Sequence, residues 1–373
     1  MNKKIGIIIG LLVLVLVVVI TVSLVSSNKQ DTFKIGYAGP LTGAMGVSTG
    51  ESIFQAFQLA NEQHPTVNGK KVEVIYEDDV CDPKKAVNAV QKLIEVDKVD
   101  VIVSGLCSGS VLSTAPIVEK AKVVMVSPGA AAPSITNAGD YTFRLAASSV
   151  TAGKAVASLI EKYDYKRIGI IYENNEYPVG WKDAIVSAYE NRSDVKIFTE
   201  GAPIASSDVR TQIMKIAAQK PDVILVATLT PGMANALLNQ LHELKVNKPI
   251  IANEVFSLRS VIHNPFAENM LVTVYKYGNS STDFQKFLAD YKQKFNKDIQ
   301  EDIYGAASYD TYTLLLKTKE SCGNSGSDCI KNYLYDTKNW SGLSGTISID
   351  QNGDSSREFV LKVVKGGKAV EIN

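Results

Sequence analysis

Two short loops hold the residues of this chain that are best suited to binding a small anion. Residues 99–103 form an apolar run that leads into Ser104-Gly-Leu-Cys-Ser-Gly-Ser110, and residues 123–126 lead into Ser127-Pro-Gly-Ala-Ala-Ala-Pro133. The pattern after the first loop, from Val111 to Lys120, predicts a helix. A loop that opens a helix presents free backbone N–H groups, hydroxyls and the positive end of the helix dipole, which together suit a carboxylate. We interpret the two loops as a candidate site for a small molecule with an anionic group.

Cys107 suggests a second kind of chemistry at the same place. The segment Gly105-Leu-Cys107-Ser-Gly109 fits a nucleophile elbow on a strand-to-helix turn, as in a cysteine hydrolase. Such a nucleophile needs a base, and the three histidines, His64, His242 and His263, lie in no recognisable motif. Their scatter and the cysteine spacings also fit no zinc pattern. The sequence therefore argues against an enzyme and against a metal site, and it indicates no cofactor.

The same stretch resembles a known family. Cys81-Asp-Pro83, Leu106-Cys-Ser108 and Ser127-Pro-Gly-Ala130 follow one another in the order found in the leucine/isoleucine/valine-binding proteins. These are type I periplasmic binding proteins that serve ABC importers, and the resemblance extends from about Phe33 to the C-terminus. It implies a two-lobed, clamshell-like protein that binds an amino acid or a related zwitterion between its lobes and delivers it to ABC permease subunits. A ligand-sensing receptor module with the same clamshell is an alternative.

The resemblance implies roles for three residues of the two loops. Ser108 would hold the α-carboxylate of the ligand through its hydroxyl and nearby backbone N–H groups, and the carbonyl of Gly129 would accept a hydrogen bond from the ligand ammonium. Ala131 stands where the family has a threonine, so only its backbone is left to touch the ligand. Such a loss would weaken the clamp on this side of the ligand.

Three further residues match ligand contacts of the family. Glu254 aligns with the glutamate that pairs with the ligand ammonium, Tyr177 with a tyrosine of the second lobe, and Tyr304 with an aromatic residue near the hinge.

Two positions depart from the family. The loop Thr42–Gly50 lacks the usual aromatic residue and is one residue longer, and Leu229 replaces a tyrosine. The ligand side chain therefore cannot be copied from the family, and an amide or urea-like solute is an alternative.

The four cysteines favour disulfides, because their number is even and all lie beyond the apolar N-terminal run. Cys322 and Cys329 flank a short loop that a bridge could close. The resemblance pairs Cys81 with Cys107, which would remove the nucleophile of the hydrolase alternative. A pairing between the two distant pairs is the remaining possibility.

The N-terminus predicts a membrane segment. Lys3 and Lys4 precede an uncharged apolar run from Ile5 to about Val25, and about 20 such residues can span a bilayer as a helix. We expect this helix to anchor an extracytoplasmic protein to the cell membrane. The alternative is a long signal peptide cleaved after Ser27, which would leave a secreted or periplasmic protein.

Length and composition fit this interpretation. The chain has 373 residues, of which 45% are hydrophobic, enough for two domains with a real core. Its formal net charge is zero and it has no long basic run, which argues against nucleic acid as a partner. Strands alternate with amphipathic helices along the chain, a rhythm typical of parallel sheets covered by helices on both faces. We expect a monomer.

The fold we predict is α/β, with two doubly wound parallel-sheet lobes joined by a three-strand hinge and preceded by one transmembrane helix. The resemblance places residues 1–31 in the anchor and linker, residues 32–148 with 278–355 in the first lobe, and residues 149–277 with 356–373 in the second. The crossovers would fall at three places: Leu145–Thr151, Val274–Gly278 and Ser355–Glu358.

Overall fold

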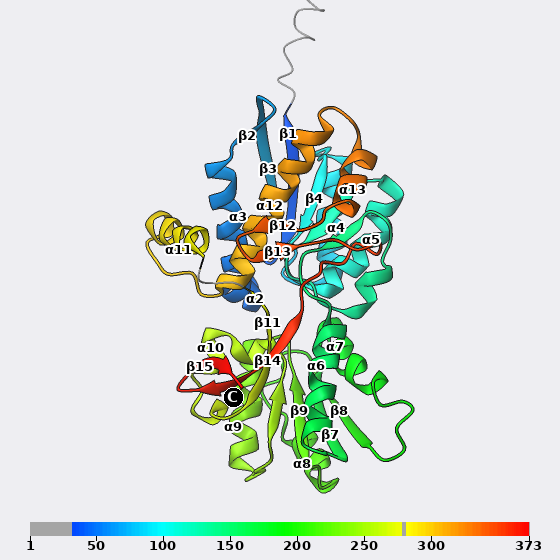
Figure 1. Cartoon of the computed structure of the whole chain (residues 1–373), viewed down its shortest axis with the longest axis vertical. Helices are drawn as coiled ribbons and strands as arrows, with labels where there is room; N and C mark the ends of the chain where they lie inside the picture. The colour runs from blue at the N-terminus through cyan, green and yellow to red at the C-terminus, as the bar shows by residue number, and fades with distance from the viewer. Residues whose placement is uncertain (1–31, 278–280, 373) are drawn as a thin grey trace, which may run out of the picture.

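The computed structural model describes residues 32–277 and 281–372. They fold into two α/β lobes, each built around its own sheet, and the lobes lie one above the other in Figure 1. The expected membrane anchor falls on residues outside this part of the chain. Among the described residues, no helix has the length and apolar character needed to cross a bilayer.

The first lobe contains a six-stranded sheet with the order β2-β3-β1-β4-β5-β6. All neighbouring strands are parallel except β2, which pairs with β3 in the antiparallel sense. Strands β1, β4, β5 and β6 are almost wholly buried, as expected for parallel strands covered on both faces. The strands are β1 (Phe33–Gly39), β2 (Thr66–Val67), β3 (Lys70–Asp78), β4 (Val101–Ser104), β5 (Val124–Ser127) and β6 (Thr142–Arg144).

Helices from distant parts of the sequence complete the first lobe. The C-terminal α12 packs against α3, and Ser308 in α12 donates to the carbonyl of Ile53 in α3 at 2.8 Å. On the other side α4 packs against α5. The helices are α2 (Gly43–Met45), η1 (Gly46–Gly50), α3 (Glu51–Gln63), α4 (Pro83–Glu95), α5 (Ser108–Ala121), η2 (Pro133–Asn137), α11 (Thr282–Phe295), α12 (Asp302–Cys322) and α13 (Ser327–Tyr335). The hairpin of β12 (Trp340–Gly342) and β13 (Gly345–Ile347) follows α13.

The second lobe contains a seven-stranded sheet with the order β15-β14-β11-β10-β9-β7-β8. Its first five strands along the chain are parallel, and the C-terminal β14 and β15 add an antiparallel edge. The strands are β7 (Arg167–Glu173), β8 (Lys196–Ala202), β9 (Val223–Ala227), β10 (Ile250–Ala252), β11 (Leu271–Tyr275), β14 (Phe359–Lys365) and β15 (Lys368–Glu371). The helices are α6 (Ser149–Lys162), α7 (Glu176–Ser187), α8 (Arg210–Ala218), α9 (Pro231–Glu243), η3 (Glu254–Ser257), α10 (Arg259–Ile262) and η4 (Pro265–Ala267).

The chain crosses between the lobes three times: after β6, after β11 and before β14. Two buried ion pairs hold the crossovers. Arg144 makes two hydrogen bonds of 2.7 Å with Asp354, and Arg357 lies 3.3 Å from Asp310. A buried charge is stable only when it is paired and hydrogen-bonded, so these pairs fix the paths of the first and third crossovers to the first lobe.

Candidate ligand-binding site

A cavity lies between the two lobes, at the carboxyl ends of their parallel strands. It encloses about 370 Å³ of space outside the protein atoms, part of which is open to solvent. Five of the six candidate residues from the sequence line it: Ser108 and Gly129 of the first lobe, Tyr177 and Glu254 of the second, and Tyr304 of α12. The remaining lining residues are Met45, Thr49, Leu106, Leu229, Val255 and Leu258.

Ser108 is the first residue of α5 and is buried. The first backbone hydrogen bond of this helix runs from Val111 to Cys107, so the N–H groups of the preceding residues have no partner within the helix. The hydroxyl of Ser108 accepts a hydrogen bond from the backbone N–H of Ala132 at 3.1 Å. The hydroxyl therefore ties the two small-residue loops together and keeps its own proton for a second partner.

Gly129 brings the second loop close to the first. A Cβ at this position would lie 2.9 Å from Cδ1 of Leu106 and 3.3 Å from the carbonyl oxygen of Gly105. Only glycine fits such a close approach without a shift of its neighbours. Ala131 is placed differently: it is not among the residues that line the cavity, and its carbonyl accepts hydrogen bonds from the N–H and the hydroxyl of Ser149.

Glu254 carries the only carboxylate among the residues that line the cavity, and it is only 4% exposed. The hydroxyl of Tyr177 donates a hydrogen bond to its Oε2, and the hydroxyl of Tyr304 donates to its Oε1 at 3.3 Å. Burial raises the pKa of Glu254 to about 7, although the two tyrosine hydroxyls act in the opposite direction. Burial therefore disfavours the ionised carboxylate, and a cation placed beside it would stabilise that form.

A second buried glutamate shapes the rim of the second lobe. Glu173, at the end of β7, accepts hydrogen bonds from the N–H groups of Ala205 at 2.8 Å, Leu229 at 2.7 Å and Thr230 at 3.1 Å. Asn253 similarly bonds the backbone of Thr228 through both ends of its amide. These contacts fix the loops after β8, β9 and β10, and so they hold Leu229 and Glu254 at the cavity.

A disulfide bond of the first lobe lies directly beside Ser108. Cys81 is bonded to Cys107, and Cys322 to Cys329, so no cysteine is free. Because the sulfur of Cys107 is bonded, the cysteine hydrolase hypothesis is wrong for this form of the protein.

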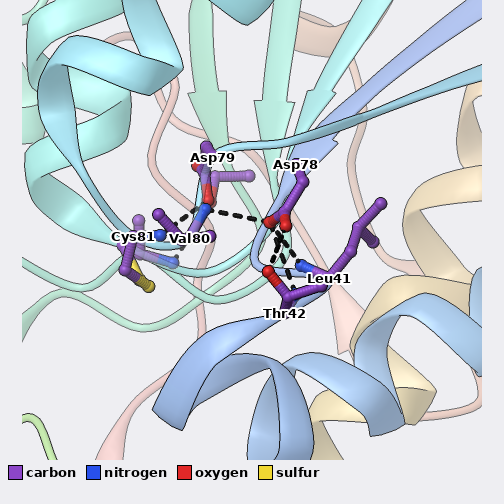
Figure 2. The surroundings of a disulfide bond; sticks show 9 residues. Leu41, Thr42, Asp78, Asp79, Val80 and Cys81 are labelled. Carbon is purple, nitrogen blue, oxygen red and sulfur yellow. Dashed lines mark hydrogen bonds between the residues drawn. A yellow bond between two sulfur atoms is a disulfide. The ribbon is translucent and has the colours of Figure 1, made fainter.

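Figure 2 shows the turn that carries Cys81. The Asp78 carboxylate accepts hydrogen bonds from Leu41 and Val80, at 2.9 and 3.0 Å, and from the Thr42 hydroxyl. Asp79 accepts from the N–H of Cys81 at 2.9 Å. These bonds support a turn in which two consecutive residues, Val80 and Cys81, have φ of 44° and 60°.

The two lobes touch beside the cavity. A Cβ on Gly180, in α7 of the second lobe, would lie 2.6 Å from Cδ of Pro133 in η2 of the first lobe. Gly109 in α5 similarly faces Glu176 in α7, at 3.5 Å from a Cβ to Cγ. Together with the bond from Tyr304 to Glu254, these contacts show that the structure is in a closed conformation.

Sequence reasoning named Leu229 and the loop Thr42–Gly50 as departures from the family, but it assigned no role in the cavity to Thr49 or to the rest of the apolar wall. Met45 and Thr49 belong to the loop that the resemblance marks as one residue too long, and the structure forms a π-helical turn there, η1. A π-helical turn accommodates one extra residue per turn, so it absorbs this insertion. The signal that could have located it is the pair of glycines, Gly46 and Gly50, both of which pack tightly against the backbone of residues 40–41.

The charges of the cavity lining limit which ligands fit. One buried carboxylate lines it, and no lysine or arginine does among the described residues. An anionic group of the ligand must therefore be held by neutral donors such as Ser108 and the first turn of α5. A cationic group would be drawn to Glu254.

Two α/β lobes that close on a buried cavity with this lining define a solute-binding protein. A family model described as periplasmic binding protein matches residues 32–368, and the chain belongs to this family. Members of the family are substrate-binding proteins rather than enzymes.

Known proteins from several bacteria are similar to this chain. An "Amino acid binding protein" of Pseudomonas aeruginosa is 30% identical over 218 residues, which are 56% of this chain and 57% of that protein. The "Leucine-, isoleucine-, valine-, threonine-, and alanine-binding protein" of the same species is 25% identical, and the match covers 88% of each chain.

Solved structures share the fold. A leucine-binding protein of Thermotoga maritima has a TM-score of 0.82 and 26% identity, over 90% of this chain and 96% of that one. A solute-binding protein of an ABC transporter from Rhodopseudomonas palustris, in complex with 3,4-dihydroxybenzoic acid, has a TM-score of 0.76 and 22% identity, over 91% and 96%. The fold therefore does not by itself identify the ligand.

Proposed function

We propose that this chain is the extracytoplasmic solute-binding component of an ABC importer and that it binds a small α-amino acid in the cavity between its lobes. The main support is the position of Glu254. It is a buried carboxylate with a raised pKa, held by a tyrosine of each lobe, in a cavity that no cationic side chain of the described residues lines. An α-ammonium group satisfies this carboxylate with a charge-assisted hydrogen bond.

The first lobe would hold the α-carboxylate of the amino acid, and both lobes would contact its α-ammonium group. The Ser108 hydroxyl and the N–H groups of the first turn of α5 bind the α-carboxylate, and the Gly129 carbonyl accepts from the ammonium. On the second lobe, Glu254 accepts from the ammonium, with Tyr177 beside it. Tyr304 closes the cavity near the hinge, where its ring lies 5.5 Å from that of Tyr275.

Binding would then work through closure. Contacts with both lobes are made only when the lobes close, so the ligand shifts the equilibrium toward the closed form, and the permease recognises that form. The relative named for leucine, isoleucine, valine, threonine and alanine supports a small, largely apolar ligand side chain, as do Met45, Leu106, Leu229, Val255 and Leu258 in the lining.

Aromatic acids are the competing ligand class, because a protein of the same fold holds 3,4-dihydroxybenzoic acid. Such an acid brings a carboxylate and no ammonium. Its carboxylate would meet no cationic group among the described residues of the lining, and it would repel Glu254 whenever that group is ionised, because like charges in a buried site repel. The lining therefore favours a zwitterion.

A thermal-shift screen of the full-length protein in detergent tests this function. Ligands that bind only the native state raise the melting temperature, by an amount that corresponds to about 2.7 kcal/mol at 100 times Kd. We expect a rise with free α-amino acids such as leucine, valine or threonine, and none with N-acetylleucine, which lacks the ammonium, or leucinamide, which lacks the carboxylate. A rise only with hydroxybenzoates, acetamide or urea would refute the proposal and identify the other class.

A further inference from the structure

Thr49 carries a polar group in the cavity that the proposed function leaves unused. Its side chain is 1% exposed and lines the cavity, and its Oγ1 has no hydrogen-bond partner among the described residues. Most buried hydroxyls in proteins are hydrogen-bonded, and leaving one without a partner costs about 1–3 kcal/mol. This unpaired hydroxyl therefore points to a partner that arrives with the ligand.

The backbone around Thr49 is fixed on both sides. A Cβ on Gly50 would lie 2.4 Å from the carbonyl oxygen of Pro40, and a Cβ on Gly46 would lie 2.7 Å from the carbonyl carbon of Leu41. The π-helical turn η1 is therefore pressed against the end of β1 and continues directly into α3. Thr49 is β-branched, so its χ1 angle is restricted as well. Its hydroxyl is held in place before any ligand binds.

The surroundings of this hydroxyl suggest which part of the ligand it meets. The other polar side chains of the lining, Ser108, Tyr177, Glu254 and Tyr304, serve the α-carboxylate and α-ammonium groups under the proposed function. The rest of the lining is aliphatic or a thioether. Thr49 is therefore the polar side chain left for the ligand side chain.

We propose that the Thr49 hydroxyl hydrogen-bonds to a hydroxyl on the ligand side chain, and that the site prefers threonine to its isostere valine. This inference rests on the proposed function. A hydroxyl both donates and accepts, so two hydroxyls pair without any change of charge in the cavity. A site built to bond a hydroxyl discriminates against the ligand that lacks it, because the protein group is then left unpaired.

Threonine and valine have nearly the same shape and differ by a hydroxyl in place of a methyl group. The same replacement can be made in the protein at Thr49. We would measure the Kd of both amino acids by calorimetry for wild type, Thr49→Val, Thr49→Ser and Thr142→Val. Thr142 in β6 is a matched control, because it is also 1% exposed with an unpaired Oγ1 but does not line the cavity. The melting temperature of each variant without ligand shows whether it is folded.

Wild type, Thr49→Ser and Thr142→Val should bind threonine about tenfold or more tightly than valine. Thr49→Val should lose this preference or reverse it. The inference is wrong, while the proposed function stands, if wild type prefers valine, if it binds other amino acids but neither of these two, or if Thr49→Val keeps the ratio of wild type. If wild type binds neither amino acid nor any other, the proposed function fails, and the inference fails with it.

Discussion

The backbone N–H of Arg259 donates a hydrogen bond of 3.2 Å to the carboxyl group of Glu301, and this bond joins the two lobes. Arg259 begins α10 of the second lobe. Glu301 precedes α12 of the first lobe, and its own N–H donates to the hydroxyl of Ser52 in α3 at 3.1 Å. Burial is the main cause that raises the pKa of Glu301 to about 8 from an ordinary value of 4.5, so the group is protonated at neutral pH in the closed form.

The closed form should therefore lose stability as the pH rises. Between pH 4.5 and 8, Glu301 is protonated in the closed form and ionised in the unfolded protein. Its contribution to stability is therefore fully present below the ordinary pKa of Glu301 and is lost as the pH rises through about 8. Each unit of difference in pKa corresponds to about 1.4 kcal/mol. Because the pKa of Glu301 rises by about 3.5 units, from 4.5 to about 8, we expect the closed form to lose up to about 5 kcal/mol of stability at pH 8.5.

Glu301→Gln is the test, because glutamine imitates the protonated acid in shape and charge. Its melting temperature should exceed that of wild type at pH 8.5 and match it at pH 5. Equal curves for the two proteins across this range would show that Glu301 does not titrate in the folded protein.

The ammonium partner of the ligand gives the second prediction. Glu254→Gln keeps the shape of the side chain but removes the charge. Its amide oxygen can still accept from one tyrosine hydroxyl, while its NH2 group must donate to the other. In a desolvated cavity this should cost roughly 2–5 kcal/mol of binding free energy. Ser108→Ala should cost less, about 0.5–1.5 kcal/mol, because the backbone N–H groups of α5 remain. Calorimetry with the ligand from the screen measures both, and wild-type affinity in Glu254→Gln would favour an uncharged amide or urea-like ligand.

The sequence located most of the fold and all the polar side chains of the cavity lining except Thr49, for local reasons. The Asp82 carboxylate caps α4 by accepting from the N–H groups of Lys84 and Lys85, and such a cap depends only on neighbouring residues. Strands β9 and β10 are short apolar runs between turn signals, which a sequence pattern can indicate. Five of the six candidate residues line one cavity because the loops after parallel strands meet at the same edge.

The sequence could not show contacts that depend on how the lobes meet. Glu301 and Arg259 are 42 residues apart in sequence, and no periodic pattern links them. The first crossover was expected to extend to residue 151, but α6 already begins at Ser149, whose N–H and hydroxyl bind the carbonyl of Ala131 in the first lobe. Thr49 was missed because the extra residue and the glycines of its loop do not show which side chain of the turn faces the cavity.

The closing surface gives the third prediction. Gly180→Ala should favour the helix α7 by about 1 kcal/mol, because glycine is a poor helix former. Its new methyl group would nevertheless lie 2.6 Å from the ring of Pro133 in the closed form. We therefore expect ligand binding to weaken by about tenfold or more while the ligand-free melting temperature does not fall.

Gly232→Ala is the matched control for this change. Gly232 also lies in a helix, α9, and a Cβ there would meet no atom within 4 Å. This variant should bind the ligand as wild type does. Equal affinities in the two variants would contradict a role for the contact between α7 and η2 in closure.

The two disulfides should differ in their effect on binding, although removal of either should destabilise the protein. The two cysteines of each bridge are separated by 26 positions in sequence for Cys81 and Cys107 and by 7 positions for Cys322 and Cys329. Loop entropy predicts a loss of about 3–4 kcal/mol for the double change Cys81→Ala with Cys107→Ala, and about 2 kcal/mol for Cys322→Ala with Cys329→Ala. Urea unfolding of both double variants measures these losses.

Ligand affinity separates the roles of the bridges further. Cys107 directly precedes Ser108 at the start of α5, and Cys81 belongs to the turn that Asp78 and Asp79 hold in place (Figure 2). Loss of this bridge frees the N-terminus of α5, so we expect a several-fold weaker affinity at a temperature where the variant is fully folded. The bridge from Cys322 to Cys329 closes the loop after α12, and neither cysteine lines the cavity. Its removal should leave the Kd unchanged, and an equal loss of affinity in both variants would show that the effect comes from global stability and not from the position of Ser108.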